Sequence, residues 1–151
     1  MSFTVRVATV DDATALASLE AEARASLVDA RGGPQLLAEQ PAVDDWTAVV
    51  ADAASAVWLA TIEDVPVGYL QLALPTPADP RGRVLQVYVL PGARELGFGD
   101  DMLAAAIDAT RAAGGTTIES FALPGDRETK NLFERAAVTA RKLIVSKRLD
   151  G

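Results

Sequence analysis

The sequence predicts an α/β protein built on one mixed β-sheet with helices on its faces. Half of the 151 residues are hydrophobic, which is enough to form a core in a chain of this length. Apolar residues alternate in some stretches, as in strands, and recur every three or four residues in others, as in helices. The predicted strands first follow one another and later alternate with helices, an order that favours both antiparallel and parallel pairs.

The first part of the chain is predicted to form a strand and two helices. Apolar and polar residues alternate over 3–7, which is typical of a strand. The aspartates at 11–12 favour the start of a helix whose apolar residues continue to Leu27. The stretch Arg-Gly-Gly-Pro at 31–34 should end that helix, and a second helical stretch covers 43–53.

The rest of the chain is predicted to contain five strands and two helices. The strands cover 57–62, 67–74, a stretch ending at Pro91, 117–121 and 141–149. One helix follows Gly99 and ends at Gly114-Gly115, and another is capped by Asp126 and runs to about Ala137. The predicted order is therefore β-α-α-β-β-β-α-β-α-β, in a single domain spanning 1–151. The proline-rich segment 75–82 is predicted to be a loop.

The composition excludes several kinds of chemistry. The chain has no cysteine, which removes a thiol nucleophile, disulfides and thiolate metal sites. It has no histidine, the commonest general base and zinc ligand, so we expect no metal. Catalysis would have to use carboxylates, tyrosines, backbone dipoles and water. No apolar stretch is long enough to cross a membrane and no leader opens the chain, so we expect a cytoplasmic protein without a membrane partner.

The net charge of −7 is unevenly distributed. Residues 1–126 carry −11, whereas residues 127–151 carry +4. The basic segment is either a solvated polar face or a region that attracts the phosphates of a nucleotide cofactor. Its basic residues are not interleaved with aromatic ones and the whole chain repels phosphate, which argues against nucleic-acid binding.

The most informative stretch joins a predicted strand to a predicted helix through Arg94-x-x-Gly97-x-Gly99. At such a junction unpaired N–H groups point outward, the helix dipole adds positive potential, and glycine allows a phosphate to come close. A plain turn is the structural alternative. The stretch lacks the third glycine of the Rossmann motif and the Gly-Lys-Ser/Thr of a P-loop.

This stretch resembles the acyl-CoA-binding segment of the GNAT N-acetyltransferase superfamily, in which Gln/Arg-x-x-Gly-x-Gly/Ala follows a strand and a proline-containing turn. The resemblance implies the GNAT acyl-CoA N-acyltransferase fold, with acetyl-CoA as cosubstrate and an amine of a small molecule or peptide as acceptor. It implies direct transfer of the acetyl group. It also implies a set of cofactor-binding residues: Tyr88, Val89, Leu90, Arg94, Glu95, Leu96, Gly97, Phe98, Gly99, Asp100, Asp126 and Phe133.

The catalytic groups are harder to place. In many family members a tyrosine on the last helix gives a proton to the departing thiolate, but Phe133 lies at that position here. Tyr88 or Tyr69 is a substitute donor. Glu119 is the candidate general base that accepts the amine proton, with Ser120 as a relay, although a glutamate in a strand usually faces solvent.

A second function is consistent with these departures. A GNAT-fold protein that binds acyl-CoA without turnover, or that serves as an interaction or regulatory module, would not need the missing tyrosine. For an active enzyme, the acidic body suits a cationic amine, and residues 29–46 and 75–83 should set its specificity. This fold often pairs through its sheet or terminal strand, so a homodimer is one option, with Leu143, Val145 and Leu149 at its interface.

Overall fold

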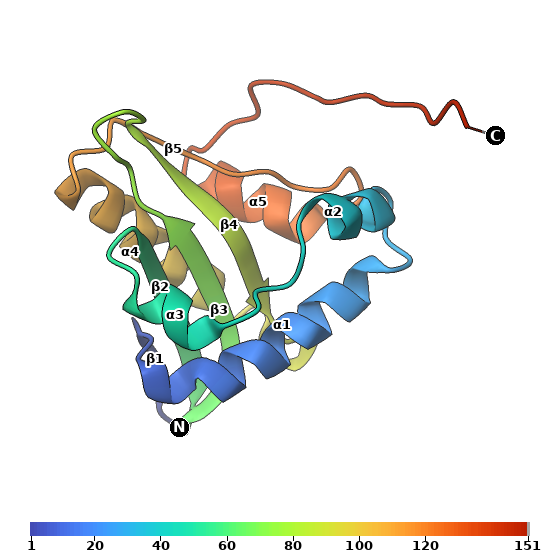
Figure 1. Ribbon diagram of the computed structural model, residues 1–151. Helices are drawn as coiled ribbons and strands as arrows, with labels where there is room; N and C mark the ends of the chain where they lie inside the picture. The colour runs from blue at the N-terminus through green and yellow to red at the C-terminus, as the bar shows by residue number, and fades with distance from the viewer. Residues whose placement is uncertain (151) are drawn as a thin grey trace.

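The computed structural model describes residues 1–150, which fold around a five-stranded sheet with the order β1-β2-β3-β4-β5 (Figure 1). The first three pairs are antiparallel and β4 pairs with β5 in parallel. This confirms the predicted mixed sheet. The strands are β1 (Phe3–Val7), β2 (Ser55–Ile62), β3 (Val65–Ala73), β4 (Arg81–Val89) and β5 (Thr117–Glu119).

Helices cover both faces of this sheet. Figure 1 shows α1 and α3 on one face and α4 and α5 on the other. The helices are α1 (Ala13–Leu27), α2 (Gly33–Glu39), α3 (Trp46–Ala51), α4 (Phe98–Ala112) and α5 (Arg127–Arg135), with short 3-10 turns η1 (Val10–Asp12) and η2 (Pro91–Ala93). The Gly-Pro pair predicted to end the first helix also begins α2, because proline is favoured in the first turn of a helix.

Two hydrophobic clusters hold the layers together. On one face Met102 and Leu103 of α4 pack on the sheet with Leu70, and on the other Leu16 of α1 packs with Tyr69. All five side chains are at most 1% exposed. Tyr69 and Leu70 are neighbours in β3, so their side chains point to opposite faces of the strand. Residues 67–74 are accordingly almost all apolar, as expected of a strand buried on both faces.

The sheet divides between β4 and β5. These strands pair only from Arg81 to Arg83, opposite Thr117 to Glu119. The register of β3 and β4 shifts at the same level, so that Leu85 is an extra residue in β4, as in a β-bulge. Beyond this point β4 has a strand neighbour on one edge only, among the residues that the structure describes.

The predicted terminal strand over 141–149 is wrong. Residues 139–150 form neither a helix nor a strand, and Figure 1 shows this segment as an extended chain outside the sheet. Leu143, Ile144 and Val145 are 79–90% exposed. A strand needs a partner edge, and β5, with three residues, offers a short one. The order of elements therefore ends with α5, and it contains one helix more before β2 than predicted.

Candidate active site

The loop from β4 to α4 has the geometry of an anion site. The backbone amides of Glu95 through Asp100 donate to no acceptor within residues 1–150, and the first amide bonded at the start of α4 is that of Asp101, to the carbonyl of Gly97 at 3.0 Å. Glu95 and Gly97 have left-handed φ angles of +68° and +87°. Six successive free amides at the N-terminus of a 15-residue helix attract a negatively charged group.

The two glycines of this loop have different roles. No atom lies within 4 Å of the point where a Cβ of Gly97 would be, so the space above this residue is open. A side chain there would enter the space that the amides face, and the positive φ would strain it. A Cβ on Gly99 would lie 3.4 Å from Cδ1 of Leu132, an ordinary van der Waals contact, so Gly99 faces α5 and the space there is not open.

Arginines neutralise two of the carboxylates around the loop. Arg135 Nε donates to Asp100 at 2.9 Å. Arg94 Nε lies 3.0 Å from the carbonyl oxygen of Val89 and 3.1 Å from Glu128 Oε2, so this side chain ties the end of β4 to α5. These ion pairs reduce the repulsion that acidic residues would exert on a phosphate at the helix start.

A cavity of about 990 Å³ extends from this loop across the free edge of β4 to α1 and α2. On the side of the cavity opposite β4, the segment after β5 comes close to the α1–α2 turn, since a Cβ on Gly32 would lie 3.4 Å from Leu123. The structure brings nine of the predicted site residues to the cavity wall: Tyr88, Val89, Arg94, Glu95, Gly97, Phe98, Gly99, Asp100 and Asp126.

Three predicted cofactor-binding residues do not line the cavity. The amide of Leu90 is bonded to the carbonyl of Val67 in the neighbouring strand at 2.8 Å. Leu96 is 45% exposed to solvent. Phe133 is 7% exposed and belongs to the core beside α4, where packing accounts for it. Their assignment to the cofactor stays a prediction.

Glu119 also lies away from the cavity wall. It is the last residue of β5, and its carboxylate accepts a hydrogen bond from Arg81 at 2.9 Å. Arg83 comes within 4.0 Å of the same oxygen. Both arginines are at the start of β4, the end opposite the β4–α4 loop. The base role of Glu119 stays a prediction, and this geometry weighs against it.

A polar network behind the cavity was not anticipated from the sequence. Gln86 Nε2 donates to Glu20 Oε2 at 2.7 Å and to Gln71 Oε1 at 3.0 Å, and the hydroxyl of Tyr69 donates to Gln86 Oε1. Glu20 is 3% exposed and also accepts from the indole N–H of Trp46 at 3.3 Å. One signal was available, because Glu20 follows Leu16 by four residues and so lies on the apolar face of α1.

The two tyrosines at the cavity are held in the neutral form. Burial raises the pKa of Tyr69 far above its ordinary value, and the nearby charge of Glu20 raises it further. Burial also raises the pKa of Tyr88, although Arg94, whose guanidinium lies 5.8 Å from the ring centre, opposes the shift. Near neutral pH both phenols therefore keep their proton, and the hydroxyl of Tyr69 donates its hydrogen bond to Gln86.

Comparisons with known proteins agree with this geometry. The model of the acetyltransferase (GNAT) family matches residues 19–137. No curated protein matches the chain. Within residues 1–150 we find no helix that is long and apolar enough to span a membrane, and no group of three or more His, Cys, Asp or Glu side chains that could hold a metal ion.

Solved structures share the fold at low sequence identity. A ribosomal-protein-alanine N-acetyltransferase from Brucella melitensis biovar Abortus 2308 is 19% identical, with a TM-score of 0.70 over 99% of this chain and 100% of that one. The mutant BH1408 protein from Bacillus halodurans is 17% identical, with a TM-score of 0.77 over 97% and 99%. AAC(6')-Iy in complex with a bisubstrate analogue is 14% identical, with a TM-score of 0.73 over 98% of each chain. At these identities the likeness concerns the fold.

Proposed function

Since the chain belongs to the GNAT acetyltransferase family, we propose that it moves an acetyl group from acetyl-CoA directly to the amine of a small molecule or peptide. The observation that carries this proposal is the row of six free amides from Glu95 to Asp100 at the start of α4. A diphosphate fits such a row because each oxygen can accept from successive N–H groups without a cation.

The free edge of β4 would hold the rest of the cosubstrate. Leu90 donates its amide to β3, so by the alternation of an antiparallel strand the backbone groups of Val87 and Val89 face the other edge, where the carbonyl of Val89 also accepts from Arg94. An extended chain with amide groups, such as pantetheine, can bond to this edge as an added strand. The bulge at Leu85 and the end of the β4–β5 pairing leave the room for it.

Acetyl-CoA supplies the thioester, and the acceptor nitrogen forms the new bond to its carbonyl carbon as the bond to sulfur breaks. Tyr88 lines the cavity, so its phenol is the candidate that gives a proton to the departing sulfur. Phe133 cannot do so. A thiol has an ordinary pKa of about 8.5, so the thiolate can also leave without a protein acid. The amine proton passes to water.

The site is tested by filling it. Gly97→Glu places bulk and negative charge among the free amides, and we expect it to weaken the binding of CoA by at least about a hundredfold in titration calorimetry. Gly92→Glu is the matched control, because a Cβ at Gly92 also meets no atom within 4 Å and this residue does not line the cavity. Equal affinities for the two variants would show that the diphosphate binds elsewhere.

A CoA-binding protein without turnover is the second candidate, and the buried Phe133 at the usual proton donor position favours it. Release of free thiol from acetyl-CoA in the presence of a panel of amines separates the two. Binding of CoA without thiol release by any amine would support the second candidate, whereas amine-dependent release supports the transferase.

A further inference from the structure

The cavity has an end that the cosubstrate, as placed above, leaves free. We define the acceptor end as the part of the cavity wall formed by α1, α2, the bulge of β4 and the segment after β5. From its charges we infer that the acceptor is a small amine that also carries a carboxylate and an apolar side chain, as a hydrophobic amino acid does. This inference rests on the proposed function, because it assumes that the CoA diphosphate binds to the loop of residues 94–100, which we call the phosphate loop.

The charges on the cavity wall are divided between its two ends. Every carboxylate on the wall belongs to the phosphate loop or to the start of α5: Glu95, Asp100, Asp126 and Glu128. The charged side chains of the acceptor end are those of two arginines, Arg24 and Arg31. The two acidic residues of α1, Glu20 and Glu22, do not line the wall, although the charge of Glu22 is felt at Tyr88 and that of Glu20 at Tyr69. A polyamine would therefore find no carboxylate on the wall of the acceptor end to pair with directly.

Arg24 is set apart from the other arginines of residues 1–150. It and Arg94 are the two that are not largely exposed, and Arg94 pairs with Glu128. No carboxylate lies within 4.0 Å of Arg24 in the described chain. Glu20, four residues earlier on the same helix, is in the position that normally forms an ion pair with an arginine. Its carboxylate instead accepts from Gln86, Trp46 and the backbone of Val43.

The guanidinium of Arg24 is fixed in place but not saturated. It donates to the carbonyl oxygens of Gln40 at 2.6 Å and Leu37 at 3.2 Å, at the end of α2. Two of its five N–H groups are used, so the others can bind a carboxylate. A partly buried, positioned cation without a counter-ion binds an anion more strongly than an exposed one does. Its charge is also felt at Tyr69, on the floor of the cavity.

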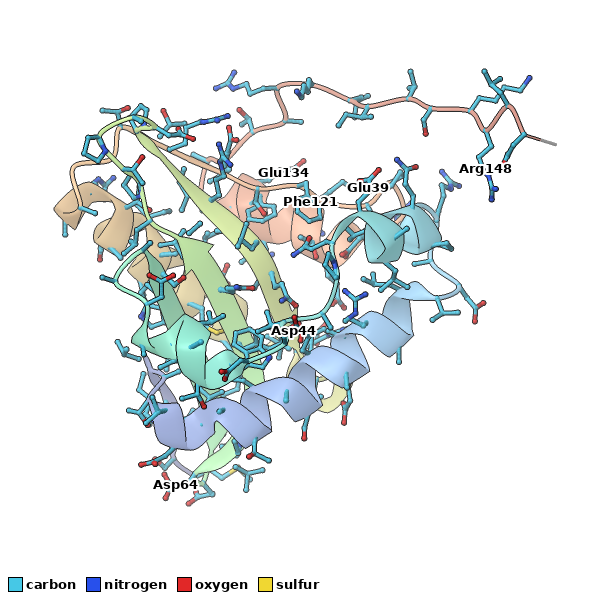
Figure 2. All side chains as sticks on the ribbon, in the orientation of Figure 1. Glu39, Asp44, Asp64, Phe121, Glu134 and Arg148 are labelled. Atoms are coloured by element: carbon cyan, nitrogen blue, oxygen red, sulfur yellow. The ribbon has the colours of Figure 1, made fainter. Side chains whose placement is uncertain are left out.

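The rest of the acceptor end is apolar and would receive a hydrocarbon side chain. Phe121 is on the segment that follows β5, and Figure 2 labels its side chain, which is 47% exposed. Other apolar residues that line the cavity include Ala23, Leu27, Ala30, Leu36 and Leu85.

The experiment uses compounds that differ in the carboxylate alone. N-acetyl-L-leucine and N-acetyl-L-leucinamide, which correspond to the products, are titrated into the CoA-saturated protein by calorimetry. We expect the carboxylate compound to bind at least tenfold more tightly, as expected for one charge-assisted hydrogen-bonded pair. Arg24→Gln should abolish this preference, and Arg24→Lys should retain part of it. Arg111→Gln, at an exposed residue of α4, is the control.

The outcomes are distinguishable from a failure of the proposed function. Failure of CoA itself to bind overturns the placement of the cosubstrate. If CoA binds but the two leucine compounds bind equally, or neither binds, or Arg24→Gln weakens both alike, the assignment of Arg24 to an acceptor carboxylate is overturned. The comparison of the two leucine compounds in the wild-type protein remains valid even if Arg24→Gln disturbs α2. Thermal denaturation of the variant shows whether it does. The rates of thiol release with L-leucine and with L-leucinamide make the same comparison in the reaction, and we expect the faster rate with L-leucine.

Discussion

Tyr88 and Glu119 were both predicted as catalytic residues, and their surroundings differ. Tyr88 lines the cavity with a pKa raised above its ordinary value, whereas Glu119 is held by Arg81 outside the cavity wall. A residue engaged in an exposed ion pair has little reason to be near the reacting atoms, and such a pair contributes little to stability.

Replacement of each residue tests these roles. Tyr88→Phe removes the protonated hydroxyl, and we expect kcat for acetyl transfer to fall by about ten- to a hundredfold with little change in CoA affinity. Glu119→Gln should leave kcat within about twofold of the wild type, because the carboxylate does not reach the cavity. Steady-state thiol release measures both. A large loss in Glu119→Gln, with normal binding, would restore that residue as the base.

At the scale of elements, Asp12 joins β1 to the start of α1. It is 9% exposed, accepts from Arg6 of β1 at 2.7 and 2.9 Å, and accepts from the amide of Thr9 at 2.8 Å. These hydrogen bonds lower the pKa of Asp12 from its ordinary value to about 2, chiefly through Arg6. The ionised form of Asp12 is thus more stable in the folded chain than in the unfolded one.

The pH dependence of stability follows from that lowered pKa. The stabilisation is complete above the ordinary pKa of about 4 and is lost as the pH falls towards 2, where the folded chain also takes up the proton. Because Arg6 is half-exposed, we expect the contribution to be about 1 kcal/mol. Asp12→Asn should lower the free energy of unfolding by this amount at pH 6 and by much less at pH 2.5, measured by urea denaturation. A constant difference at the two pH values would contradict the assignment.

Local patterns predicted most of the elements, and long-range pairing explains the errors. The spacing of apolar residues gave α1 and α4, and Asp126 caps α5 by accepting from the amide of Thr129 at 3.0 Å, as expected. The terminal strand over 141–149 failed because its formation depends on a free partner edge. The network of Glu20 and Gln86 joins residues far apart in the sequence, so neither residue by itself indicated the shared site.

At the scale of the whole molecule, the C-terminal segment 139–150 lies outside the two hydrophobic clusters. Its apolar side chains are exposed, and the side-chain bond recorded to the body is that of Ser146 to Gln35 at 3.2 Å. No residue after Arg135 lines the cavity. Single-domain organisation, a cytoplasmic location and the homodimer stay predictions.

Limited proteolysis tests the placement of this segment. It contains four trypsin sites, Arg141, Lys142, Lys147 and Arg148, in backbone without helix or strand. We expect trypsin to cleave there well before it cuts in α5, and the shortened protein to bind CoA as the full chain does. Mass spectrometry and calorimetry measure the two effects. Protection of these sites in the free protein would indicate that the segment pairs with a sheet edge in solution.

Because β4 and β5 separate, the stability of the folded protein can depend on the concentration of acetyl-CoA. If the cosubstrate adds the missing strand, its binding energy becomes part of the free energy of unfolding, about 2.7 kcal/mol at a concentration one hundred times the Kd. A cell short of acetyl-CoA would then hold a protein that opens more often and is degraded sooner. The level of the folded protein would then follow the level of acetyl-CoA.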